Sequence, residues 1–159
     1  MPQVVVKTTS ELTAALTPDE LADLVDEFAF YKDGWPQFQD MFYYFGKDGG
    51  YTFPQLTAPH QIQHVHLWPS SVSPESTDWE AGWTRTENTK KPTRKTSNRV
   101  LVYAKDGHQY LLIYILPEPY AHDIAKSLTN ETAALMNLFK RITEAFIFNK
   151  LDLNGVPYP

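Results

Sequence analysis

The sequence predicts an α+β fold in which helices pack against one face of a small antiparallel β-sheet. The stretches 61–67, 99–105 and 109–115 are short, rich in β-branched and aromatic residues, and alternate between two kinds of side chain. The stretches 18–32 and 130–147 instead repeat apolar residues at helical spacing. Because each predicted strand has one apolar face and each helix one apolar stripe, we expect the helices to cover a single face of the sheet.

The N-terminal segment begins with a short apolar run at residues 3–7 that we expect to form a strand. The clearest local signal follows at Thr17, which suits an N-cap, with Pro18 at the first helical position and Glu20 placed to complete a capping box. This helix should end at Gly34. Its apolar stripe consists of Leu21, Leu24, Val25 and Phe28.

Two long segments lack a periodic pattern. Residues 35–58 are rich in aromatic side chains and are expected to form a loop, with a short helix at 40–45 and a turn at 48–50. Residues 69–97 carry proline, serine, threonine and charged residues. A structureless loop of that length is unusual in a compact domain and is commonly functional or disordered.

Residues 100–116 are expected to form a β-hairpin around the turn signal Asp106-Gly107, which pairs Tyr103 with Tyr110. The apolar side chains then share one face, the predicted core face: Val100, Val102, Ala104, Leu111, Ile113 and Ile115. Four larger side chains share the other face: Arg99, Tyr103, Tyr110 and Tyr114. These four either form a binding surface or pack beneath the long loop.

The C-terminal part continues with a short helix at 120–126 and a long helix that begins at 129–131. Residues 151–159 form a proline-ended tail. We therefore expect one domain over residues 1–150, followed by a tail over residues 151–159.

Composition excludes several classes of protein. The chain has 159 residues, enough for one domain with a sizeable core, and a net charge of −5. It contains no cysteine, so a disulfide framework, a thiolate nucleophile and a cysteine-ligated zinc site are all excluded. No apolar run approaches the roughly 20 residues of a membrane span, and the N-terminus lacks the apolar region of a signal peptide. We expect a soluble, cytoplasmic protein with no membrane partner.

The predicted strand between Pro59 and Pro69 carries the candidate chemistry. His64 and His66 should point to the same face of this strand, roughly 6.5–7 Å apart, which is twice the rise per residue. Two imidazoles at that distance can flank one phosphate or one metal ion. The alternative is a polar strand face with no chemistry, because a His-X-His pattern alone decides neither interpretation.

A basic segment lies within the long loop of an otherwise acidic protein. Either an anion-binding role or a solvated loop is compatible with its composition. The basic residues are Arg85, Lys90, Lys91, Arg94, Lys95 and, at the start of the next strand, Arg99.

The order of these motifs resembles that of the YafO family of toxins from type II toxin–antitoxin systems. The matching pieces are the helix that ends at Phe30-Tyr31-Lys32-Asp33-Gly34, the strand His64-Val65-His66-Leu67, and the hairpin with Leu101-Val102-Tyr103 and Leu111-Leu112-Ile113. Pro117-Glu118-Pro119 and a C-terminal amphipathic helix follow in the same order, so the resemblance covers roughly residues 12–147.

The family also carries an Arg-Thr-polar-Asp segment before the hairpin, and Arg94-Lys95-Thr96-Ser97-Asn98 is similar to it. Either Arg94 or Lys95 takes the place of the arginine. Asn98 stands where the family has an acidic residue. The loop at 69–93 and the tail past Lys150 are additions to the family pattern.

The resemblance implies a RelE-like toxin, an endoribonuclease that cleaves mRNA on the ribosome, inhibits translation and is held silent by a cognate antitoxin. No metal and no cofactor are implied. RNA cleavage of this kind needs a base, an acid and cations that hold the phosphate. His64 and His66 are the candidate acid and base, and the other catalytic candidates are Arg94, Lys95 and Tyr103.

Further residues are candidates for RNA binding, with tyrosines as stacking platforms for unpaired bases. They are Arg85, Lys90, Lys91, Asn98, Arg99, Tyr110 and Tyr114.

Two other classes of function remain compatible with the residues. One is a metal-dependent hydrolase or oxygenase with His64 and His66 as ligands and with His60, His108 or His122 as a third. The other is a non-catalytic binding module that uses the aromatic surface and the long loop.

Overall fold

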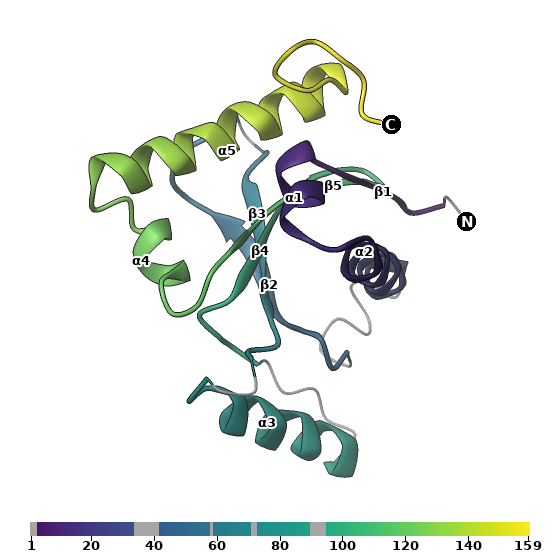
Figure 1. The fold of residues 1–159 in the computed structure, drawn as a ribbon, viewed down its shortest axis with the longest axis vertical. Coiled ribbons are helices and arrows are strands. Elements are labelled where there is room, and N and C mark those ends of the chain that lie inside the picture. The colour runs from purple at the N-terminus through teal and green to yellow at the C-terminus, as the bar shows by residue number, and fades with distance from the viewer. Residues whose placement is uncertain (1–2, 34–41, 58, 71–72, 90–94) are drawn as a thin grey trace.

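A computed structural model describes residues 3–33, 42–57, 59–70, 73–89 and 95–159 of the chain (Figure 1). These residues contain a five-stranded sheet in the order β1-β5-β4-β3-β2. The strands are β1 (Val5–Thr8), β2 (Phe45–Tyr51), β3 (Ile62–Leu67), β4 (Val100–Asp106) and β5 (Gln109–Leu116). The helices are α1 (Ser10–Ala15), α2 (Pro18–Asp33), α3 (Ser76–Thr89), α4 (Ala121–Ala125) and α5 (Asn130–Asn149). The predicted α+β class is confirmed.

The sheet is mixed, whereas the sequence predicted an antiparallel one. Strands β2 to β5 pair antiparallel, but β1 pairs with β5 in parallel, with Val5 opposite Gln109 and Thr8 opposite Leu112. No hairpin links β1 to β5, because most of the chain lies between them. Local turn chemistry therefore does not determine the direction of β1.

The helices cover both faces of the sheet, which corrects the prediction that they cover one. Helix α2 packs Leu24 and Phe28 against one face, and α5 packs Phe139 and Phe146 against the other (Figure 1). The reason is that β4 and β5 bury the side chains of both faces, as strands between two helical layers do. We call the two sides the α2 face and the α5 face.

Strand β2 and helix α3 occupy segments that the sequence analysis assigned to loops. The turn predicted at 48–50 is wrong, because these residues lie within β2 and pair with β3. Earlier in the same strand, a Cβ on Gly46 would come within 2.0 Å of the Lys95 carbonyl oxygen, so this glycine allows a close approach of two backbone segments. Helix α3 buries Trp79, Gly82 and Thr86, which follow a helical spacing of three and four residues. Residues 40 and 41 of the short helix predicted at 40–45 lie outside the described residues.

The β4–β5 hairpin forms with its turn one residue later than predicted, which shifts the cross-strand pairing by two residues. Asp106 pairs with Gln109, so Gly107, with a φ of 60°, and the residue after it make the turn. Tyr103 consequently lies opposite Leu112. A register shift after Val102 also moves the later part of β5, so that Tyr114 lies on the α5 face and Ile115 on the α2 face.

The predicted helix signals are confirmed. Glu20 Oε2 accepts a hydrogen bond from the Thr17 amide at 2.9 Å, and Thr17 Oγ1 accepts one from the Glu20 amide at 3.2 Å. At the other end of the chain, the C-terminal tail is tied to β1, where Lys7 Nζ donates a hydrogen bond to the Tyr158 carbonyl oxygen at 3.1 Å. Within the described residues, none of the helices has the length and apolar character that a membrane span requires.

Candidate functional site

The histidine pair lies on the α5 face of β3, as the alternation of the strand predicted. The ring centroids of His64 and His66 are 5.9 Å apart. Their neighbours Val65 and Leu67 are fully buried in the core on the opposite, α2 face. Helix α4 adds a third imidazole, because the His122 ring centroid is 5.5 Å from that of His66. We call His64, His66 and His122 the histidine cluster.

The backbone at Ser97 holds the ring of His66 in place. His66 Nδ1 lies 2.9 Å from the Ser97 amide nitrogen and 2.7 Å from the Ser97 carbonyl oxygen. Ser97 is itself buried, and its hydroxyl donates to the Leu67 carbonyl oxygen at 2.7 Å. One nitrogen of His66 is thus engaged by the protein, and the residue as a whole is buried, with 4% of its surface exposed. Such orientation by a backbone contact is typical of functional histidines.

His64 is held by a ring instead of a hydrogen bond. Its imidazole stacks on Tyr51 with a centroid separation of 3.9 Å and an interplanar angle of 7°. Its Nδ1 is buried and has no hydrogen-bond partner among the described residues. A buried nitrogen without a partner is costly and uncommon in native proteins, and such atoms often belong to functional sites.

Both histidines on β3 are shifted towards the neutral form. Burial, and to a smaller extent the neighbouring His66, together lower the pKa of His64 to about 4. Burial likewise lowers the pKa of His66. At neutral pH both rings of the free protein are therefore neutral and able to accept a proton.

Two residues that the sequence analysis did not assign to this site lie close to the pair. Lys47, exposed on β2, has a positive charge that contributes to the lowered pKa of both His64 and His66. Tyr51, on the same strand, covers one side of His64. The signal for both is the two-residue alternation of β2, which becomes usable only when β2 is recognised as a strand.

Asn98 lies at the edge of the histidine cluster. Its backbone amide donates a hydrogen bond to Glu75 Oε1 at 2.8 Å. Its side-chain oxygen accepts one from the His122 backbone amide at 3.4 Å. Asn98 therefore connects the start of β4 to α4, beside His122.

Most of the predicted basic residues lie elsewhere. Lys95 is buried, donates to the Phe42 carbonyl oxygen at 3.0 Å, and lies above the Trp79 ring at 5.4 Å, so its ammonium group has a structural role. Arg99 lies on the α2 face, where its guanidinium stacks over Trp68. Arg85 is exposed on α3. The remaining predicted cations, Lys90, Lys91 and Arg94, lie outside the described residues.

The predicted stacking tyrosines are not available to RNA bases in this structure. Tyr103 and Tyr110 are only 1% and 3% exposed, because α2 covers them. Burial raises the pKa of Tyr110 to about 12. It also raises the pKa of Tyr103 well above its ordinary value. Tyr114 is half-buried on the α5 face, where its ring contacts Phe139.

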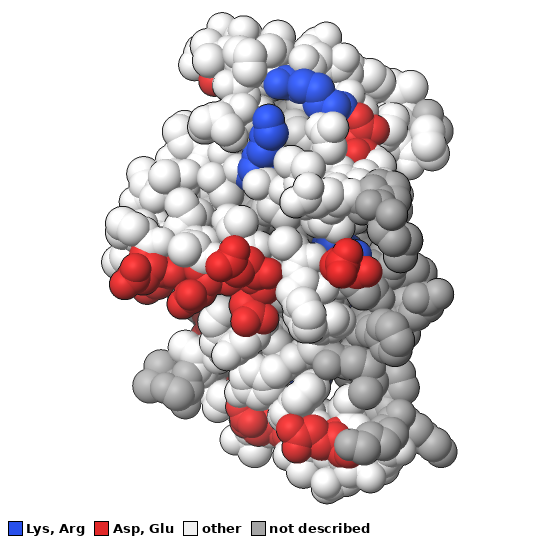
Figure 2. All heavy atoms as spheres, turned by 90° about the vertical axis from the view of Figure 1, so that its right-hand side faces the viewer, with Lys and Arg blue, Asp and Glu red and all other residues white. Residues whose placement is uncertain are grey.

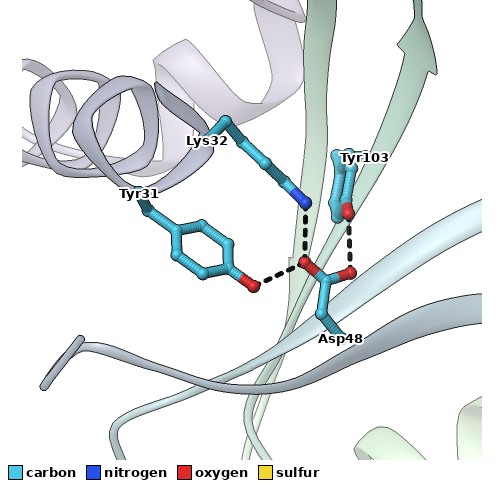
Figure 3. A network of polar contacts seen from close by, with 4 residues as sticks. All are labelled: Tyr31, Lys32, Asp48 and Tyr103. Carbon is cyan, nitrogen blue, oxygen red and sulfur yellow. Dashed lines mark hydrogen bonds and ion pairs between the residues drawn. The ribbon is translucent and has the colours of Figure 1, made fainter. Parts of the chain in front are cut away.

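Tyr103 instead belongs to a buried polar network centred on Asp48 (Figure 3). Asp48 accepts hydrogen bonds from the hydroxyls of Tyr103 at 2.6 Å and Tyr31 at 2.7 Å, and it forms an ion pair with Lys32 at 2.8 Å. Burial lowers the pKa of Lys32, and the Asp48 carboxylate opposes that shift. The network joins the last turn of α2 to β2, and we call it the Asp48 network.

Metal ligation has no support in the geometry of the described residues. No group of three or more histidine, aspartate or glutamate side chains within them lies close enough to hold a metal ion. This includes the sets in which His60, His108 or His122 joins the pair on β3.

A mixed sheet with helices on both faces, with a histidine cluster on one of them, is consistent with the RelE-like toxin fold. The comparison of the sequence with protein families agrees with this class. The family described as "Toxin YafO, type II toxin-antitoxin system" matches residues 31–148, which is most of the chain. The chain therefore belongs to the YafO family of type II toxins, which confirms the resemblance, and such a toxin has a cognate antitoxin as its partner. Neither a curated protein nor a solved structure matches the chain significantly.

Proposed function

We propose that this toxin is a metal-independent endoribonuclease that cleaves mRNA on the ribosome with His64 and His66 as its acid–base pair. The observation that carries the proposal is the pair itself: two neutral imidazoles, 5.9 Å apart, on one face of β3. Membership of a toxin family supports the choice of RNA cleavage over a structural role for these histidines.

In the proposed reaction, one neutral imidazole takes the proton of the 2′-hydroxyl group. The 2′-oxygen attacks the adjacent phosphorus, and the bond from phosphorus to the 5′-oxygen breaks. The departing 5′-oxygen receives a proton from the second imidazole. The products are a 2′,3′-cyclic phosphate and a 5′-hydroxyl end, and no metal is needed to balance the reaction.

The second imidazole must be protonated before it can act as the acid. A bound phosphodiester places a negative charge beside the pair, and an opposite charge within about 4–6 Å raises the pKa of a histidine. RNA binding therefore charges one ring of the pair while the other stays neutral. Lys47 is positioned to hold the same phosphate as a point charge.

Dependence on the ribosome is consistent with the charge of the protein. The net charge is −5, and the exposed side of α2 carries a row of carboxylates (Figure 2). These residues are Asp19, Glu20, Asp23, Asp26 and Glu27. Such a surface repels free RNA, whose affinity for proteins comes largely from cationic contacts to phosphate. A ribosome presents the mRNA strand to the histidine cluster without requiring a broad basic surface on the toxin.

The test is cleavage of mRNA in a purified translation system, with cut sites mapped by their new 5′ ends. His64→Ala and His66→Ala should each lower the cleavage rate by roughly 10²–10⁴-fold. His108→Ala is the matched control, because His108 is exposed at the hairpin turn, and it should cleave normally. Because ribosomes themselves need Mg²⁺, EDTA is applied to the toxin alone and removed before the assay, and the treated toxin should cleave as fast as the untreated one. Loss of activity after this treatment, with recovery when a transition metal is returned to the toxin, would contradict metal independence.

A further inference from the structure

A hollow lies directly beside the histidine cluster, in the segment that links β2 to β3. Its volume is about 450 Å³. The described residues that line it come from one short stretch of chain between the two strands: Tyr51, Thr52, Gln55, Leu56, Pro59, His60 and Gln61. Leu56 is only 6% exposed and packs into the core under α5, so the linking segment is anchored at its middle.

Tyr51 connects this hollow to the proposed reaction. Its ring lines the hollow and also stacks on the imidazole of His64 at 3.9 Å. Any group that binds against Tyr51 in the hollow is therefore separated from His64 by the Tyr51 ring. In an RNA strand whose phosphate is held at His64 and His66, a neighbouring base is the group within reach of this position.

The chemistry of the lining fits a nucleobase better than a phosphate. The described lining includes two carboxamides, one imidazole and one phenol, and it contains no lysine, arginine, aspartate or glutamate. Carboxamides of Gln55 and Gln61 each present donors and an acceptor, which is what the edge of an unpaired base requires. Aromatic side chains and proline provide flat surfaces for stacking.

A close contact with the backbone shapes the hollow, and aromatic side chains lie near its edge. A Cβ on Gly50 would lie 2.1 Å from Gln61 Oε1, so a glycine at this position allows the Gln61 amide to lie against β2. At the rim, the His60 ring makes an edge contact with Phe148 at 5.6 Å, and Phe148 is 56% exposed. Phe53, in the same linking segment, is 74% exposed.

We propose that this hollow is a base-binding subsite that takes an unpaired base adjacent to the cleaved phosphate and sets the base preference of cleavage. This inference rests on the proposed function, because it assigns a substrate contact to the same site. It names the chemical class of the ligand, an unpaired nucleobase, and not a particular base.

Direct binding tests the subsite separately from cleavage. In an NMR titration of the full chain with the four ribonucleoside 5′-monophosphates, the side-chain amides of Gln55 and Gln61 should shift, and more for one base than for the others. The Gln55→Ala/His60→Ala double variant should bind about ten-fold or more weakly, on the scale of a lost base contact. Thr57→Ala is the control, because Thr57 is exposed in the same segment and does not line the hollow.

Mapped cleavage sites give the second readout. The double variant should still cut mRNA but with a flattened base preference, whereas His64→Ala should stop cutting at every site. If the amides do not shift and the double variant keeps the natural preference, the subsite is wrong while the proposed ribonuclease stands. If the bases bind selectively but the natural chain cuts no mRNA, the proposed ribonuclease is wrong, and the hollow binds bases without a role in cleavage.

Discussion

The two faces of the sheet differ in whether their buried polar side chains have hydrogen-bond partners. On the α2 face, the carboxylate of Asp48 is satisfied by Tyr31, Lys32 and Tyr103, and the whole group is closed off from water. On the α5 face, His64 leaves a buried nitrogen without a partner among the described residues. The satisfied set stabilises the fold, whereas the unsatisfied imidazole is the group that we propose acts on a substrate.

The outer surfaces of these two layers differ as well. Helix α2 turns a row of carboxylates outward, which repels phosphate (Figure 2). The α5 face instead presents Lys47, the histidine cluster and the hollow beside Tyr51. Substitutions in the Asp48 network should therefore lower stability, whereas substitutions of Lys47 and of the histidine cluster should lower activity.

The largest expected loss of stability follows removal of Asp48. Asp48→Ala leaves the buried Lys32 ammonium without its carboxylate, and breaking a buried pair in this way typically costs about 3–5 kcal/mol in unfolding free energy. Denaturant titration measures this loss. The Asp106–Lys150 pair is the matched control, because both side chains are about two-fifths exposed, and Asp106→Ala should cost about 1 kcal/mol or less. Equal losses at the two sites would contradict the structural role of the Asp48 network.

Acid should destabilise the protein through His64. Its pKa is about 4 in the folded state, below the ordinary value of 6.5, so the unfolded chain binds the proton more tightly between these two pH values. The stability that depends on neutral His64 is full above pH 6.5 and is lost as the pH falls towards 4, by up to about 3 kcal/mol. Unfolding free energies measured across this window should fall less steeply for His64→Gln. An unchanged slope would mean that burial of His64 does not shift its pKa.

The smallest expected effect concerns Lys47. Lys47→Ala removes one cation beside the histidine pair, so cleavage on ribosomes should weaken and become less sensitive to salt, with the logarithmic slope reduced by about 1 or less. Rates measured over a range of salt concentrations give this slope. Lys105→Ala is the control, since Lys105 is exposed at the other end of β4. If both variants change the slope equally, Lys47 makes no particular contact with phosphate.

Local signals in the sequence were sufficient for part of this architecture. The capping residues Thr17 and Glu20 predicted the start of α2, and the two-residue period of β3 predicted that His64 and His66 share a face. Each of these inferences depends on geometry within a few residues of chain. The predicted β4–β5 hairpin was also confirmed, although its register was not.

Contacts between distant segments determined the rest. Tyr103 looked like an exposed platform because the sequence does not show that a carboxylate 55 residues away satisfies its hydroxyl. Asp48-Gly49-Gly50 suggested a turn because the pairing of this segment with β3 is not visible in the local sequence. Once β2 was missed, Lys47 and Tyr51 could not be placed beside the histidines.

The division of roles between the two faces can be tested by measuring ribosome-dependent cleavage by two folded variants side by side. His66→Ala removes an imidazole from the α5 face, and Tyr103→Phe removes only a hydroxyl group from the buried Asp48 network. The division between the faces predicts that His66→Ala loses roughly 10²–10⁴-fold in cleavage rate, while Tyr103→Phe keeps its rate and loses stability instead. If Tyr103→Phe abolishes cleavage and His66→Ala cleaves normally, the catalytic group lies on the α2 face and the account is contradicted.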